Sequence, residues 1–184
     1  QTSNVHFHFQ PPRKEVPISL GATGPKNLQL AGEIADGVIL GYVSGHAYVR
    51  HALEQVRIGA KRANKTLENY EVILYALISV SQDDAAAREA IKPFLATCIS
   101  VMTAYAEQPL FTLAGLDPER VREMGRVYLS EGTPPVSLVT DEMIDAVAIA
   151  GDAERCRENL SKFVDAGVTQ VVAFDMPTIS GQQA

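Results

Sequence analysis

The chain has 184 residues, of which 46% are hydrophobic and 21% charged, a composition typical of soluble globular proteins. Its 16 basic and 22 acidic side chains give a net charge of −6, which argues against sequence-independent nucleic-acid binding. No apolar stretch is long enough to span a bilayer, and the two cysteines are too few for a disulfide framework and lack the spacing of metal ligands. These features predict a cytoplasmic protein without a metal site.

Apolar strands and helices alternate along the first part of the chain. Residues 1–16 are expected to form an irregular lead-in, because Pro11-Pro12 excludes a helix. Residues 17–82 are expected to form the first part of the fold, in which the spacing of apolar residues predicts alternating elements. These are a strand at 17–20, a helix at 25–35, a strand at 38–41, a helix at 46–64 and a strand at 72–80.

The second part of the chain is organised differently. Residues 83–150 have the pattern of successive helices, and a segment of this length is better explained as a helical insertion than as a simple crossover. Residues 151–184 then supply a helix at about 152–166, a strand at 168–174 and a polar tail. Strands that alternate with helices predict a parallel sheet of the α/β class, and this pattern alone is compatible with an open sheet or a barrel.

The segment that follows the first predicted strand carries the clearest signal for a binding site. The strand leads into two glycines, and Pro25 then starts a helix whose first amide groups have no intrahelical acceptor. Gly21 and Gly24 would let an anion approach the backbone. Thr23 and Lys26 would add a hydroxyl group and a positive charge. The same residues are also compatible with a tight strand-to-helix turn that binds nothing.

The chain resembles the bacterial-luciferase-like monooxygenase superfamily in three segments. The first is the run PISLGATGPKNLQLAGEIADGVIL, which starts at Pro17. The run TDEMIDA from Thr140 and the run DAGVTQVV from Asp165 fit the same relatives. The resemblance is greatest to the branch that depends on the deazaflavin coenzyme F420, which includes methylenetetrahydromethanopterin reductases.

This resemblance implies a (β/α)8 TIM barrel, of which the chain would form the carboxyl-terminal half. About four parallel strands and a helical insertion before the last strand are then expected. A complete barrel needs about 250 residues, and the chain begins at Gln1 rather than at a methionine. We therefore expect a missing amino-terminal half of roughly 140 residues, or another copy or another chain that covers the sheet. The protein would be a homo-oligomer or would associate with its missing half.

The resemblance also implies an oxidoreductase that transfers hydride with coenzyme F420 and acts on a small-molecule substrate. In such relatives, the positions that match Thr23 and Gly24 contact the cofactor phosphate, and those that match Gly41–Ser44 approach it. Our candidate cofactor-binding residues are therefore Gly21, Thr23, Gly24, Lys26, Gly41 and Ser44. No catalytic residue can be named, because the acid–base groups of the family come largely from the first half of the barrel.

The residues leave three alternatives open. The protein could be an FMN-dependent monooxygenase of the same superfamily, or a cofactor-binding or structural homologue without turnover. It could also be a non-redox enzyme that binds a phosphorylated ligand on an open α/β sheet. The loop Gly41–Ser44 has no basic side chain where some relatives have a lysine, which would leave phosphate binding to amide groups, hydroxyl groups and Lys26.

Overall fold

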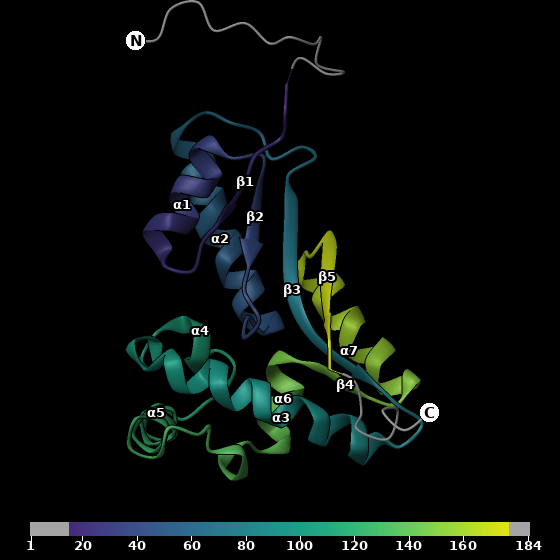
Figure 1. Cartoon of the computed structure of the whole chain (residues 1–184). Coiled ribbons are helices and arrows are strands. Elements are labelled where there is room, and N and C mark those ends of the chain that lie inside the picture. Colours follow the sequence, from purple (N-terminus) through teal and green to yellow (C-terminus); the bar gives the residue numbers. More distant parts are fainter. Residues whose placement is uncertain (1–14, 177–184) are drawn as a thin grey trace, which may run out of the picture.

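The computed structural model describes residues 15–176 of the chain (Figure 1). Strands and helices alternate through most of this range. In chain order the elements are β1 (Ser19–Gly21), α1 (Pro25–Ile34), β2 (Gly37–Leu40), α2 (His46–Arg62), β3 (Glu71–Val80), α3 (Asp84–Val101), the 3₁₀ turn η1 (Thr103–Tyr105), α4 (Pro109–Thr112), α5 (Pro118–Glu131), the 3₁₀ turn η2 (Val136–Leu138), α6 (Asp141–Val147), β4 (Ile149–Gly151), α7 (Ala153–Ala166) and β5 (Gln170–Asp175).

The strands form one parallel sheet, as the alternating pattern predicts. Its order is β1-β2-β3-β4, and β5 pairs with β3 as well. Leu20 lies opposite Val38 at the first pairing, and Tyr75 lies opposite Val172 where β5 runs along the middle of β3. Because parallel strands share one direction, the loops that follow β1 and β2 lie at the same edge of the sheet, where enzymes of this architecture place their ligands.

One strand lies in a segment for which the sequence pattern predicts helix. β4 occupies Ile149–Gly151, across the predicted boundary at residue 150. It has too few residues for a periodic signal, and it is a strand because it pairs with Ile78–Val80 at the end of β3. The four predicted strands are all present, and β4 is an addition to them. The division of the chain into a lead-in, a first part, an insertion and a last unit stays a prediction.

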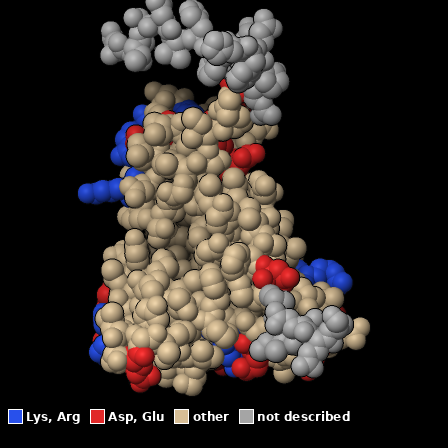
Figure 2. Space-filling model, in the orientation of Figure 1, with Lys and Arg blue, Asp and Glu red and all other residues tan. Residues whose placement is uncertain are grey.

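The two faces of the sheet differ in burial. Helices α1, α2 and α7 form one layer, and residues such as Val38 and Leu74 are buried beneath it. Side chains in register share a face of the sheet, and on the opposite face Val172 and Phe174 are 39% and 40% exposed. Figure 2 shows that charged side chains lie mostly at the margin of the molecule in that view and that its middle is uncharged.

The remaining helices gather beyond the carboxyl end of β2, as Figure 1 shows for α3, α4, α5 and α6. α3 packs against β3, β4 and α5, and α4 contacts α2. Phe111 of α4 and Leu95 of α3 are fully buried, so these helices share one hydrophobic core with the sheet. None of the helices within residues 15–176 has the length and apolar character needed to cross a membrane.

Candidate functional site

Helices α1 and α2 begin without a side-chain cap, and each follows one of the candidate loops. Their N-caps are Gly24 and Gly45, and neither helix has an acidic residue in its first turn. Within residues 15–176, the four other helices longer than one turn all have a side-chain cap and an acidic first turn; their caps are Asp83, Asp117, Thr140 and Asp152. The amide groups and the positive dipole ends of α1 and α2 are therefore available to an anion.

The glycines of the two loops leave open space beside the backbone. A Cβ atom added to Gly21, Gly24 or Gly41 would meet no other atom within 4 Å. Gly24 has φ −82° and ψ 155°, a conformation that any residue can adopt. Gly21 and Gly41 do not have positive φ either. The turn geometry itself therefore does not require glycine here, and the open space is what a ligand needs to approach the amide groups.

Tyr48, on the buried side of α2, holds the loop after β1 in place. Its hydroxyl group donates a hydrogen bond to the carbonyl oxygen of Thr23. Burial raises the pKa of Tyr48 to about 12, so the hydroxyl group stays protonated and remains a donor. Because the C=O and N–H groups of a trans peptide point in opposite directions, the Gly24 amide points away from Tyr48. Sequence analysis missed Tyr48, whose only signal is the apolar periodicity of its helix.

A pocket of about 130 Å³ lies between the two loops and the helical segment. Thr23 and the loop Gly41–Ser44 line one side of it. Cys98, Met102 and Leu110 form an apolar wall on the other side. The structure thus brings together three of the candidates, one after β1 and two after β2. The apolar wall was not predicted, because it comes from helices more than fifty residues further along the chain.

The other three candidates do not line this pocket. Gly24 borders a smaller space of about 20 Å³, beside Tyr48 and His51. Lys26 is exposed in the first turn of α1, and Gly21 is exposed at the end of β1. Their place at the uncapped start of α1 is compatible with the predicted contacts to an anion, which stay a prediction.

Four aromatic rings extend from the pocket onto the face of the sheet opposite α1, α2 and α7. The ring of Tyr42, in the loop after β2, lies 5.8 Å from that of Tyr75, 5.5 Å from Phe94 and 5.3 Å from Phe174, measured between centroids. The rings of Phe94 and Phe174 are 5.0 Å apart. These separations are in the range in which aromatic pairs attract one another. The cluster joins the β2 loop, β3, α3 and β5 into one apolar surface beside the pocket.

Cys98 is the one thiol in the pocket lining. Burial raises its pKa to about 11. The thiolate is the nucleophilic form of cysteine, so the side chain is a protonated, unreactive part of the apolar wall at neutral pH. The pocket therefore has the character of a binding site, with amide and hydroxyl groups on one side and apolar groups on the other.

Comparison with known families agrees with this geometry. Residues 1–170 match the family model described as luciferase-like monooxygenase. The chain belongs to the luciferase-like monooxygenase family. The family resemblance read from the sequence is thereby confirmed.

Curated relatives in this family carry names that refer to methanopterin and to coenzyme F420. The chain is 33% identical over 161 residues to the 5,10-methylenetetrahydromethanopterin reductase of Methanolobus tindarius, a match that covers 86% of this chain and 48% of the relative. It is 32% identical over 170 residues to a putative coenzyme F420-dependent oxidoreductase of Mycobacterium tuberculosis, with 88% and 48% covered. The chain spans about half the length of the curated relatives it matches.

Solved structures confirm the expected fold. The coenzyme F420-dependent tetrahydromethanopterin reductase of Methanopyrus kandleri superposes with a TM-score of 0.73 at 29% identity, over 87% of this chain and 45% of that one. An F420-dependent secondary alcohol dehydrogenase shares the fold, with a TM-score of 0.65 at 22% identity over 94% and 47% of the two chains. The described residues thus form part of a TIM barrel, and their assignment to its carboxyl-terminal half stays a prediction.

Proposed function

We propose that this chain binds coenzyme F420 and forms part of an oxidoreductase that transfers hydride between the cofactor and a small-molecule substrate. One observation carries the proposal. The only two long helices without a cap in the described part of the chain start from adjacent loops that share one pocket. Such an arrangement suits the phosphate of a cofactor. The names of the curated relatives support coenzyme F420 as that cofactor.

The residues present fit a phosphate-bearing cofactor. The first amide groups of α1 and α2 would donate hydrogen bonds to the phosphate, with Thr23 and Ser44 supplying hydroxyl groups. Lys26 would contribute a positive charge from the first turn of α1. Coenzyme F420, when bound, would supply the redox chemistry, and the chain would bind and orient it.

Titration of the purified chain with coenzyme F420 and, separately, with FMN tests this proposal. Quenching or polarisation of the deazaflavin fluorescence should show saturable binding of F420. Binding of FMN and not of F420 would contradict F420 as the cofactor and would support the FMN-dependent alternative. Binding of neither cofactor at concentrations that saturate a known F420-dependent enzyme would contradict the proposal.

Replacing Lys26 by alanine should weaken F420 binding without unfolding the protein. A charge-assisted hydrogen bond to phosphate contributes roughly 1–3 kcal/mol to binding, so the dissociation constant should rise by about one to two orders of magnitude. Lys26 is exposed and forms no ion pair within residues 15–176, so Lys26→Ala should change the thermal stability little. Lys61→Ala, on the exposed face of α2, is the matched control. An unchanged dissociation constant would remove Lys26 from the site.

We also propose that other strands cover the exposed face of the sheet in the working protein, supplied by a further half barrel or a second copy. Val172 and Phe174 are exposed on an edge strand, and Phe174 belongs to the aromatic cluster. An apolar sheet face and an open edge favour association. The chain of 184 residues on its own should therefore form dimers or larger assemblies in light scattering, and the double variant Val172→Ser, Phe174→Ser should form fewer. A monodisperse monomer would contradict this proposal.

A further inference from the structure

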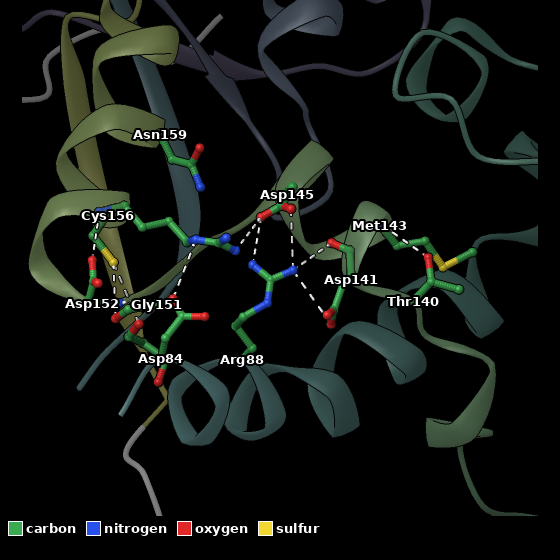
Figure 3. Close-up of polar contacts among 12 residues, drawn as sticks. Asp84, Arg88, Thr140, Asp141, Met143, Asp145, Gly151, Asp152, Cys156 and Asn159 are labelled. Atoms are coloured by element: carbon green, nitrogen blue, oxygen red, sulfur yellow. Dashed lines mark hydrogen bonds and ion pairs between the residues drawn. The ribbon is translucent and has the colours of Figure 1, made fainter. Parts of the chain in front are cut away.

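A buried arginine fastens helix α6 to helix α3. Arg88 of α3 is only 5% exposed. Its guanidinium group donates hydrogen bonds to both carboxylate oxygens of Asp145, at 2.7 Å and 3.3 Å, and to the backbone oxygen of Asp141, at 3.0 Å (Figure 3). Such a bidentate, charge-assisted contact is both strong and specific in its geometry. α6 is therefore held in one position relative to α3.

The same carboxylate connects the pair to α7. Arg155 of α7 lies 3.6 Å from Asp145 and 3.4 Å from Asp84. Asp84 also accepts a hydrogen bond from the backbone amide of Asp152, the N-cap residue of α7. The network therefore joins α3, α6 and α7 around the end of β3. A buried arginine without a charged partner is strongly destabilising. Moving α6 away from α3 would leave Arg88 in that state, so the bond to Asp145 favours the observed position of α6.

The residue that follows Asp145 in the chain lies directly against one of the candidate loops. A Cβ atom added to Gly45 would lie 2.5 Å from the backbone oxygen of Ala146. Gly45 is the N-cap of α2 and directly follows the loop Gly41–Ser44. The backbone of α6 therefore limits how far this loop can move, and it does so through a contact that tolerates only glycine.

We propose that Arg88 is a positioning residue for the loop Gly41–Gly45: by fixing α6 through Asp145, it holds this loop where it lines the pocket. The effect on the cofactor rests on the proposed function, because it requires that the loop contacts F420. The positioning itself does not rest on the proposed function, because it concerns the loop in the protein without a cofactor. Asp145 and Arg88 are 57 positions apart in the chain, and only the structure shows the bond between them.

The Gly45→Ala substitution tests the contact directly. Gly45 has φ −65° and ψ 161°, which alanine adopts without strain, so the substitution acts through the overlap with Ala146 and through the loss of a favourable N-cap residue at the first turn of α2. Hydrogen–deuterium exchange of the free protein should show about tenfold faster exchange of the amides of residues 41–49. The dissociation constant of F420 should rise by a similar factor.

The Arg88→Gln substitution tests whether Arg88 positions the loop. Arg88→Lys should keep part of the positioning, because lysine keeps the positive charge. Amide exchange of residues 41–49 should be fastest in Arg88→Gln, slower in Arg88→Lys and slowest in the wild type. Gly125→Ala is the control for a general loss of stability, because its new Cβ would overlap Thr103 in the same helical segment without touching the network. It should leave exchange of the loop unchanged.

The two measurements separate this proposal from the proposed function. Faster loop exchange in Gly45→Ala and Arg88→Gln supports the positioning role even if the wild-type chain does not bind F420, in which case the proposed function is the one that falls. Loop exchange that stays at the wild-type rate in Gly45→Ala or in Arg88→Gln overturns the positioning role, whether or not F420 binds. Exchange that rises equally in Gly125→Ala also overturns it, because the loop would then report only global stability.

Discussion

The Gly24→Val variant should fail to bind coenzyme F420 while keeping its fold. Gly24 is the N-cap residue of α1, and a new Cβ there would meet no protein atom within 4 Å. Its backbone conformation is open to valine. The loss of a favourable N-cap residue should cost about 1 kcal/mol of stability. The isopropyl group would instead fill the space through which a phosphate reaches the amides of the first turn, so binding should be lost in a fluorescence titration.

A graded series makes this result informative. Gly24→Ala should weaken binding less than Gly24→Val, because the methyl group is smaller. Ala153→Val, an exposed position at the start of the capped helix α7, should leave both stability and binding unchanged. Normal F420 affinity in Gly24→Val would show that no ligand approaches the backbone at this position.

The Gly59→Ala variant should lose much of its stability. Alanine normally favours a helix interior over glycine by about 1 kcal/mol. Here the new Cβ would overlap the backbone carbonyl of Gln29 in α1, and Gly32 has the same relation to Val56 in α2. α1 and α2 thus pack backbone against backbone and cannot accept a side chain without separating. We expect a net loss of roughly 2–3 kcal/mol in the free energy of unfolding, measured by urea denaturation.

Two comparisons show whether the helix contact causes the loss. Arg57→Ala, an exposed position on the same helix, should change stability by less than about 0.5 kcal/mol. Gly32→Ala should resemble Gly59→Ala, because it disturbs the same interface from the other side. A Gly59→Ala variant as stable as wild type would mean that the two helices do not pack as closely as described. F420 affinity should also fall, since this interface sets the relative position of the two uncapped helix ends.

Local signals in the sequence determined the secondary structure and the parallel sheet. Apolar periodicity, together with Pro25 and the glycines beside it, was enough to predict the strands and helices of residues 17–82 within a few positions. The caps are local signals too: Asp or Thr starts four helices, whereas glycine starts α1 and α2. The candidate loop after β1 could be found for the same reason, because an uncapped helix start depends on neighbouring residues alone.

Only the tertiary structure decided what surrounds those loops. β4 exists through its pairing with the end of β3, and the apolar wall of the pocket comes from α3 and α4. The bond from Tyr48 to Thr23 and the ion pair of Arg88 with Asp145 join residues 25 and 57 positions apart. Contacts of this kind leave no periodic trace in the chain, because they depend on which surfaces meet after the helices pack. The sequence by itself therefore determined which helix starts have no cap, and the packing of distant helices decided what surrounds them.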